Sequence, residues 1–280
     1  MKNKSLLFIA MLISTVLLLG ACGTDDTENT SSSTEEKDTF TVGLEAGYAP
    51  FNWTQMDDSN NGVKIDGNAE YAGGYDVEIA KKVAEGLGKE LVIVKTEWDG
   101  LVPALTSGKI DAIMAGMSPT EERKQTIDFS ENYYTSDFVM IVKKGGPFEG
   151  ATSIQDFSGA KVTAQLNTSH YGVIDQIKGV DKQTASDNFT SMRVALQSGM
   201  IDGYVSERPE GISASSANDQ FAMVEFTDGF VADEEETAVA VGLAKDSKLT
   251  EEINAILAEI SEEERQEIMD NAIKNQPAAE

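Results

Sequence analysis

The sequence predicts an α/β protein with a largely parallel sheet, built as two lobes of similar construction. Short apolar runs typical of buried strands alternate with amphipathic stretches typical of helices along most of the 280 residues. One pattern also occurs twice, because Ala104–Ala112 is echoed by Ala195–Gly203 as a helix end, a glycine and a strand. Chance similarity between short units is the alternative. Two lobes are the simplest explanation of the echo, and a cleft between lobes is the expected ligand site.

The N-terminal residues predict export. Two lysines precede the apolar run Leu6–Leu19, which has the length of a secretory signal and is too short for a comfortable membrane span. The run ends in Leu19-Gly20-Ala21-Cys22, which resembles a bacterial lipobox, the site where a cysteine is acylated and the signal removed. We therefore expect a lipoprotein signal peptide over residues 1–21, with an ordinary signal peptide and a chance cysteine as the alternative.

Cys22 is the only cysteine of the chain, so no internal disulfide can form and another purpose is expected for it. Residues 22–37 are rich in Ser, Thr, Asp and Glu and cannot bury a core, which predicts a disordered polar tether. We expect an extracytoplasmic domain that is held on the outer face of the cell membrane by a lipid, such as palmitate, on Cys22.

The charge balance excludes one class of partner. The chain has 22 Lys and Arg against 48 Asp and Glu, a formal net charge of −26. Nucleic-acid binding needs clustered positive charge for the phosphates, so we expect no nucleic-acid partner. Acidity favours solubility and attracts cations.

The first part of the domain predicts two strands, two helices and a loop. The strands are Phe40–Leu44 and Leu91–Val94, and the helices are Tyr75–Leu87, with apolar residues at four-residue spacing, and Trp98–Ser107. Asn, Asp and Gly dominate Thr54–Gly74, which predicts a surface loop with a hairpin around Asp66-Gly67.

The later part predicts four more strands and three helices. The strands are Phe138–Val142, Lys161–Ala164, Met200–Val205 and Val239–Ala244; the helices are Met192–Gln197, one carrying Leu249, Ile253, Ile256 and Ile260, and one capped by Ser261 with Glu264. Ser153–Asp156 resembles a further helix cap.

The stretch from Ile110 to Arg123 predicts an anion site. An apolar strand runs into a helix start, where Ser118 is a good N-cap, Pro119 suits the first helical position and Glu121 follows three residues after the cap. Backbone N–H groups and a positive dipole end would then face one point, and Arg123 adds a planar fork that suits a carboxylate. The alternative is a capped helix whose arginine lies in solvent.

The echoed pattern places a second segment in the corresponding position of the other lobe. Ser206-Glu207-Arg208 follows the strand of the second copy, as Gly116–Arg123 follows the strand of the first. Ligands of open α/β sheets lie beyond the carboxyl ends of the strands, so both segments are candidates for one site.

Several motifs together resemble the family 3 solute-binding proteins, the polar amino-acid receptors of ABC importers. They are Gly74–Ile79 followed by Val83-Ala84, Trp98–Leu105, Met117–Arg123, Ile127–Ser130 and Ser153–Phe157, in the family's order. The similarity covers roughly residues 40 to 275.

The resemblance implies a periplasmic-binding-protein-like (type II) fold, a two-lobed Venus flytrap with two crossover segments. We place the crossovers near Thr135–Phe138 and Thr237–Val239. Lobe 1 then comprises residues 38–136 and 239–280, and lobe 2 comprises residues 137–238.

The resemblance also implies a site for the α-amino and α-carboxylate groups of the ligand. Ser118 and Arg123 match the residues that bind the carboxylate, with Met117 beside them, and Gly116 and Glu207 match the partners of the ammonium. The loop with Thr168 and Ser169 would close on the carboxylate from the far lobe; it departs from the family at Asn167, where glycine is common. Asparagine tolerates a left-handed backbone better than most residues, so the turn is expected to survive.

Selectivity is expected in the side-chain pocket. Tyr48 and Trp98 match two rings that sandwich the ligand side chain, and Glu45 matches an acidic position that pairs with its polar or cationic end. Ring faces and a carboxylate favour a cation, so we expect arginine or lysine, with glutamine, histidine or cystine as alternatives. Core aromatics and a surface acid are the plain alternatives for these three residues.

The expected function is the substrate-binding component of an ABC importer, a monomer that captures a free amino acid by hinge closure and delivers it to the permease. An enzyme such as a dehydratase or a peptidoglycan-cleaving protein, and a sensor or adhesin, are the alternatives on the same scaffold. The single histidine, His170, and the lack of a His/Cys cluster offer little for catalysis, so we expect no enzyme, no metal and no cofactor.

Overall fold

The computed structural model describes residues 38–277 of the chain. By its internal contacts the chain separates into two units, Met1–Glu36 and Lys37–Glu280, and every described element belongs to the second. The expected signal peptide, the acylated Cys22 and the tether lie outside the described residues. Over residues 38–277 no helix is both long enough and apolar enough to cross a membrane.

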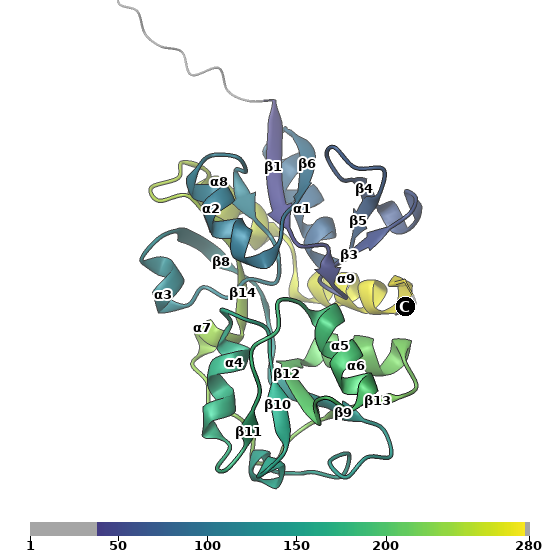
Figure 1. Cartoon of the computed structure of the whole chain (residues 1–280). Helices are drawn as coiled ribbons and strands as arrows, with labels where there is room; N and C mark the ends of the chain where they lie inside the picture. Colours follow the sequence, from purple (N-terminus) through teal and green to yellow (C-terminus); the bar gives the residue numbers. More distant parts are fainter. Residues whose placement is uncertain (1–37, 278–280) are drawn as a thin grey trace, which may run out of the picture. The chain divides into compact units, whose positions relative to one another are not determined.

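Two five-stranded sheets share one plan (Figure 1). The first has the strand order β6-β1-β7-β14-β8 and the second has the order β11-β10-β12-β9-β13. In each sheet the first three strands are parallel and the last two run antiparallel to their neighbours. Four strands of each sheet therefore run in one direction, and a single strand, β14 in the first sheet and β9 in the second, runs against them, so the prediction of a largely parallel sheet is right for four strands of each sheet and wrong for one. The strands are β1 Thr39–Leu44, β6 Glu90–Lys95, β7 Ala112–Ile113, β8 Asp128–Thr135, β14 Ala238–Leu243, β9 Phe138–Lys143, β10 Lys161–Thr163, β11 Asp181–Lys182, β12 Gly203–Glu207 and β13 Phe221–Val224.

Helices pack beside each sheet. α1, α2 and α8 contact strands of the first sheet, and α4, α5 and α6 contact strands of the second (Figure 1). α9 packs against α1 and α6. The helices are α1 Tyr75–Gly86, α2 Leu101–Thr106, α3 Glu121–Lys124, α4 Ser169–Val173, α5 Phe189–Ser198, α6 Arg208–Ala217, α7 Glu234–Thr237, α8 Leu249–Glu259 and α9 Glu262–Asn275, with short 3-10 turns at Ser59–Asn61, Trp98–Gly100, Ile154–Phe157 and Ile174–Gln176. The caps predicted at Ser153 and Ser261 are confirmed, since both side chains accept a backbone N–H of the first turn.

The sequence echo is confirmed as a structural repeat. Gly108 and Gly199 have φ angles of 72° and 77°, the left-handed conformation that ends a helix. The Asp111 carboxylate accepts from the Thr41 N–H at 2.9 Å, and the Asp202 carboxylate accepts from the Lys161 N–H at 2.8 Å. Each aspartate therefore fastens its strand to the start of the neighbouring parallel strand of its sheet, which explains why the two stretches share a sequence.

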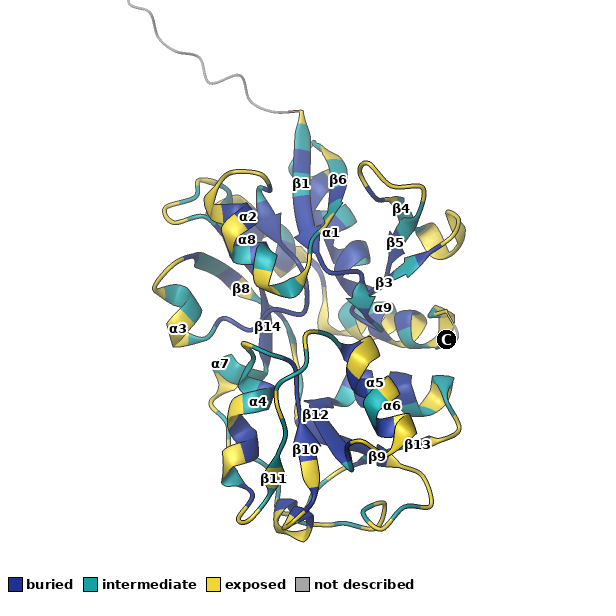
Figure 2. Ribbon diagram, in the orientation of Figure 1, coloured by how far each residue is buried: buried dark blue, intermediate teal, exposed yellow. Residues whose placement is uncertain are grey.

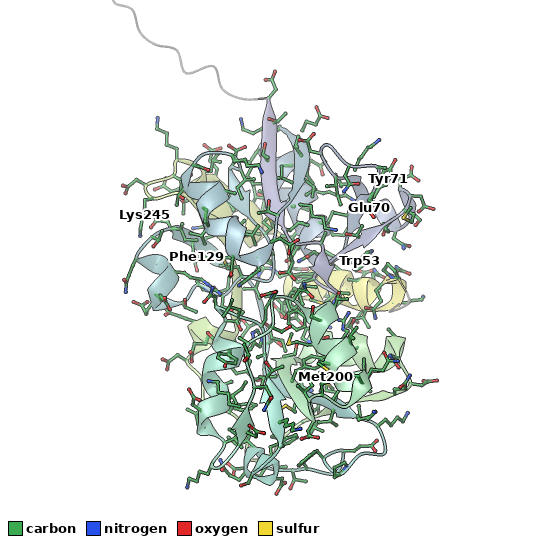
Figure 3. All side chains as sticks on the ribbon, viewed as in Figure 1. Trp53, Glu70, Tyr71, Phe129, Met200 and Lys245 are labelled. Carbon is green, nitrogen blue, oxygen red and sulfur yellow. The ribbon has the colours of Figure 1, made fainter. Side chains whose placement is uncertain are left out.

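The segment predicted as a loop is part of a small sheet. β2 (Gly47–Tyr48), β3 (Asn52–Gln55), β5 (Tyr71–Gly73) and β4 (Val63–Lys64) form four antiparallel strands in the order β2-β3-β5-β4. The hairpin predicted around Asp66-Gly67 is confirmed, because those residues join β4 to β5. Figure 3 labels Trp53 and Tyr71 of this sheet, and Glu70, which directly precedes β5. The sheet matters because β2 carries Tyr48.

Two crossovers connect the sheets. The chain leaves the first sheet between β8 and β9 and returns between α7 and β14. The crossovers run side by side, since the Ser136 N–H donates to the Thr237 carbonyl at 3.1 Å and Ala238 pairs with Thr135. Figure 2 shows that most residues of β1, β12 and β14 are buried, which gives each lobe a rigid sheet. The fold is the expected two-lobed type II fold, with polar loops placed at the sheet ends.

Candidate ligand-binding site

The predicted helix cap at Ser118 is wrong. α3 begins at Glu121, and its cap is Thr120, whose hydroxyl accepts from the Arg123 N–H at 3.4 Å. Threonine is itself a good cap, and the Ser118 hydroxyl instead donates to the Glu236 carbonyl at 3.1 Å. A four-residue helix carries little dipole, so the attraction for an anion rests on the Arg123 side chain.

Arg123 connects the two lobes. One terminal nitrogen, Nη1, donates to the Ser118 carbonyl at 2.8 Å, and the other, Nη2, donates to the Asn167 carbonyl at 2.9 Å. The guanidinium also lies over the Trp98 ring, 5.1 Å from its centroid. Burial lowers the pKa of Arg123 to about 10, so the side chain remains a cation at neutral pH.

The turn between β7 and α3 approaches the aromatic wall closely. Gly116 has a φ angle of 62°, and a Cβ at this position would lie 2.7 Å from the Tyr48 ring, so only glycine fits. Met117 is buried and its carbonyl accepts from the Ala240 N–H at 3.1 Å. The turn is thereby fixed to β14, and it holds Ser118 in a buried position next to Arg123.

The facing loop of lobe 2 keeps the turn expected of it. Asn167 has a φ angle of 57°, which confirms that asparagine adopts the left-handed conformation here. Its amide Nδ2 donates to Asp99 Oδ1 at 2.9 Å, a contact with the opposite lobe. Thr168 donates to the Gln165 carbonyl at 2.7 Å, and Ser169 begins α4.

Glu207 and His170 form a buried pair in lobe 2. Glu207 ends β12 and is completely buried, and its Oε1 lies 3.2 Å from His170 Nε2. Apart from this contact, neither carboxylate oxygen nor either imidazole nitrogen has a hydrogen-bond partner among the described residues. Buried polar atoms of native proteins are nearly always paired, which marks these groups as candidates for contacting a polar ligand. His170 was not among the residues predicted for the site, although the only histidine of the chain directly follows Thr168-Ser169.

Glu45 is buried rather than exposed. Its Oε2 accepts from Gln165 Nε2 of lobe 2 at 3.0 Å, while its Oε1 is buried without a partner among residues 38–277. Burial raises the pKa of Glu45 to about 7, against the lowering effect of the Gln165 hydrogen bond. Gln165 was not predicted; its position two residues before Asn167, at the end of a strand, was the available signal.

Tyr48 and Trp98 lie beside the same cavity but contact protein groups in this structure. The Tyr48 ring stacks on Phe51 at 5.0 Å and on Phe189 of lobe 2 at 4.2 Å. Trp98 faces the Arg123 guanidinium. The sandwich around a ligand side chain stays a prediction, and no pattern in the sequence indicates the contact between Tyr48 and Phe189.

Most of the residues described above lie around one small cavity between the lobes. A cavity of about 10 Å³ is lined from both lobes by Tyr48, Trp98, Gly116, Ser118, Arg123, Gln165, Thr168, Ser169 and His170. Glu45 contacts Gln165 and Glu207 contacts His170, and both of these partners line the cavity. Met117 lines the neighbouring groove. All ten predicted ligand-binding residues therefore lie at or beside one place.

An acidic groove of about 830 Å³ adjoins the cavity. It shares Trp98, Arg123, Thr168 and Ser169 with the cavity, and its carboxylates are Asp99, Glu121, Glu122, Asp233, Glu235 and Glu236. Arg123 is the only cation among its lining residues. In the part of the chain that the structure describes, no cluster of His, Cys, Asp or Glu has the arrangement of a metal site.

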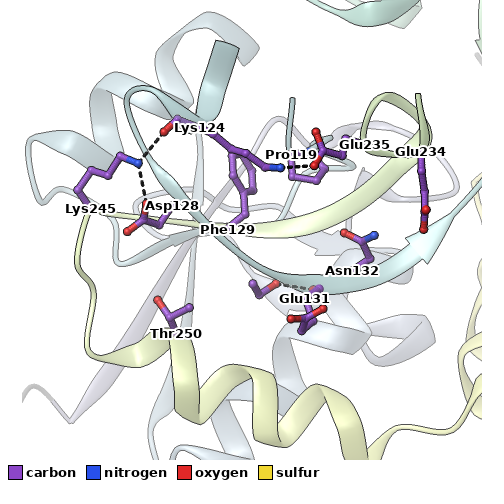
Figure 4. A pocket seen from close by; sticks show the side chains of 11 residues that line it. Pro119, Lys124, Asp128, Phe129, Glu131, Asn132, Glu234, Glu235, Lys245 and Thr250 are labelled. Atoms are coloured by element: carbon purple, nitrogen blue, oxygen red, sulfur yellow. Dashed lines mark hydrogen bonds and ion pairs between the residues drawn. The ribbon is translucent and has the colours of Figure 1, made fainter. Parts of the chain in front are cut away.

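A separate hollow of about 680 Å³ is lined mainly by residues of β8 and α7 (Figure 4). Its two lysines are both ion-paired, Lys245 with Asp128 at 2.7 Å and Lys124 with Glu235. None of the predicted ligand-binding residues lines it.

Comparison with known proteins identifies the family to which the chain belongs. Residues 40–274 match the bacterial extracellular solute-binding proteins, family 3, and the chain belongs to this family. It is therefore a solute-binding protein rather than an enzyme, and it acts outside the cytoplasm.

The chain is similar to several curated relatives and solved structures. The arginine-binding extracellular protein ArtP of Bacillus subtilis is 30% identical over 272 residues, which are 94% of this chain and 94% of ArtP. A probable histidine-binding protein of Campylobacter jejuni is 33% identical over 222 residues, 75% of this chain and 80% of the relative. Among solved structures, an amino acid ABC transporter substrate-binding protein from Streptococcus pneumoniae bound to L-arginine superposes with a TM-score of 0.74 at 26% identity, covering 85% of this chain and 94% of that one.

Proposed function

We propose that this protein is the substrate-binding component of an amino-acid ABC importer and that its ligand is a basic amino acid, arginine or lysine. The observation that carries the choice of ligand is Glu45, a buried carboxylate whose Oε1 has no partner among the described residues. An ionised carboxylate in that position is stabilised strongly by a cationic group and less by a neutral amide.

The two ends of an amino acid fit the two ends of the site. Arg123 is a half-buried, protonated guanidinium that donates to two carbonyls with its terminal nitrogens, and a ligand carboxylate is its natural counter-ion. Glu207 offers two buried carboxylate oxygens for the α-ammonium. Thr168 and Ser169 would complete the carboxylate contact from lobe 2, and the carbonyl of Gly116 would accept from the ammonium.

The acidic groove supports a cationic ligand independently. Six carboxylates and one cation line the approach to the cavity, and although Lys124 pairs with two of the carboxylates, Glu121 and Glu235, the net charge there is negative. Fields of this kind raise the local concentration and association rate of a cation by factors of about 10–10³, and salt weakens them.

The relatives are consistent with this assignment. ArtP is named as an arginine-binding protein, and the Streptococcus pneumoniae structure holds L-arginine. The Campylobacter jejuni relative is named as a probable histidine-binding protein, and this makes histidine the main competing ligand, with glutamine and cystine behind it.

The remaining parts of the proposal concern the whole chain. We infer that residues 1–21 are removed, that Cys22 carries a lipid which anchors the domain to the membrane, and that the domain acts as a monomer. Lobe 1 would comprise residues 38–136 and 239–280, and lobe 2 residues 137–238, with the permease as partner of the closed form. A gene for a permease beside this one would support import over a sensor role.

A calorimetric ligand screen tests the proposal. The domain from residue 38 is unfolded, refolded to remove bound ligand and titrated with arginine, lysine, histidine, glutamine, cystine and citrulline. Citrulline is the matched control because it has the shape of arginine without the charge. A charge-assisted contact contributes about 1.5–3 kcal/mol, so arginine should bind about 10- to 150-fold more tightly than citrulline. Equal affinity for both, or tightest binding of a neutral amino acid, would overturn the basic ligand and leave the receptor class intact.

A further inference from the structure

The structure assigns Phe189 a role in ligand selection: we propose that its ring closes the side-chain end of the amino-acid site from lobe 2 and thereby limits the length of the side chain that the site accepts. The inference rests on the proposed function for the position of the ligand. It concerns a residue that belongs to none of the motifs in the sequence.

The first support is the contact across the cleft. Tyr48 lies on β2 and Phe189 is the first residue of α5, which packs on the second sheet. Their ring centroids are 4.2 Å apart with an angle of 19° between the planes, and Phe189 is only 1% exposed. This is close aromatic stacking between the lobes, so the Phe189 ring occupies the space in front of one face of Tyr48.

The second support is the position of this contact relative to Glu45. Gln165 Nε2 donates both to Glu45 Oε2 at 3.0 Å and to the Asp187 carbonyl at 3.2 Å. The Gln165 amide therefore links Glu45, the acidic end of the site, to Asp187, which lies two residues before Phe189. A ligand whose carboxylate is on Arg123 extends its side chain towards Glu45, and so towards the wall formed by Tyr48 and Phe189.

The third support is that the wall is fixed. Asn188 caps α5 by accepting from the Ser191 N–H at 2.9 Å, which sets the start of the helix. The Tyr204 ring meets the Phe189 ring at 6.3 Å with an angle of 76°, an edge-to-face contact within lobe 2. A ring that is held by its own lobe cannot move aside easily, and a pocket with a rigid end discriminates by length.

The experiment compares arginine with homoarginine, which has the same cation on a side chain one methylene longer. The dissociation constants of both ligands are measured by calorimetry for the wild-type domain, Phe189→Ala and Phe189→Leu. Phe157→Leu is the matched control, because Phe157 is also buried and stacked, on Phe148 at 5.0 Å and 17°, but within lobe 2 and away from the site.

We expect the wild type to prefer arginine by at least about tenfold, since one excess methylene in a pocket costs about 10- to 200-fold. Phe189→Ala should reduce this ratio at least about fivefold, Phe189→Leu should reduce it less, and Phe157→Leu should leave it unchanged. Loss of the contact between the lobes should weaken both ligands alike, so the ratio separates selection from closure. The leucine variant retains a measurable test should the alanine variant not fold.

An unchanged ratio in folded Phe189→Ala, or a wild type that does not distinguish the two lengths, would overturn the role of Phe189. A wild type that prefers glutamine would overturn only the basic ligand. The same ratio is then measured between glutamine and its homologue with one more methylene.

Discussion

Glu45 should make the binding of a basic amino acid depend on pH near neutrality. Burial raises the pKa of its carboxyl from 4.5 to about 7, with the Gln165 hydrogen bond opposing and the Glu97 charge adding to the rise. A cationic side chain binds the ionised carboxylate, so the ligand and a proton compete for the same group.

The size of the effect follows from the ionised fraction. For a pKa of about 7, the ionised fraction falls from about nine-tenths at pH 8 to about 3% at pH 5.5, so the apparent Kd for arginine should rise about 30-fold over that range. A neutral ligand such as citrulline gains little from the charge and should show a much flatter profile.

Calorimetry of arginine and citrulline at four pH values measures this for the wild type and Glu45→Gln. We expect Glu45→Gln to bind arginine about 10- to 150-fold more weakly at pH 8 and to lose the pH dependence. A steep profile that persists in Glu45→Gln would refute the reasoning. It would point to Asp76, whose buried carboxyl has a pKa raised to about 7.

The raised pKa of Glu45 has the opposite effect on the stability of the unliganded domain: affinity for arginine rises with pH, whereas the free energy of unfolding falls. A carboxyl with a folded pKa above its unfolded value stabilises the fold in its protonated form, so the stabilisation is present below pH 4.5 and is lost as the pH rises through 7. The difference of pKa values corresponds to at most about 3 kcal/mol. Glu45→Gln should therefore raise the melting temperature of the unliganded domain at pH 8 by a few degrees and have little effect at pH 4.5, as measured by calorimetric scanning.

Variants at three further positions test other parts of the domain. Arg123→Ala should weaken every amino-acid ligand at least about 100-fold, because a buried charge-assisted contact with the carboxylate is lost, and retained affinity by calorimetry would contradict this. Asn167→Gly should keep the melting temperature within about 2 °C, since glycine adopts a positive φ freely, whereas Asn167→Ala should lower it more; equal effects would show that the left-handed backbone costs alanine nothing here. Asp76→Asn places an amide against the Tyr133 hydroxyl and the Asn52 amide, which both donate to Asp76 at 2.7 and 2.8 Å, and should lower thermal stability by about 1–3 kcal/mol.

Local patterns predicted local structure well. The helix at Tyr75 and the caps at Ser153 and Ser261 depend on neighbours within one turn, and all three are confirmed. Ser118 failed as a cap for a local reason as well, because Thr120 is an equally good cap two residues later and nothing in the sequence ranks the two.

Contacts between the lobes could not be predicted from the sequence. Gln165, His170 and Phe189 have ordinary interpretations as a strand end, a helix residue and a core aromatic. Their roles depend on which residues of lobe 1 face them, and that depends on how two separately folded sheets meet. The resemblance supplied positions on each lobe, such as Glu45 and Tyr48, without their partners.

The hydrogen bonds of Arg123 suggest why ligand capture and closure should be one event. Its guanidinium donates to a carbonyl of each lobe, Ser118 and Asn167, and the side chain is partly removed from water in that arrangement. A cation taken out of water needs a counter-charge, and two carbonyl dipoles supply only part of it. A ligand carboxylate supplies the rest only where both lobes surround the guanidinium, so it stabilises the closed form more than the open form. That difference in affinity is the free energy by which a ligand closes the domain.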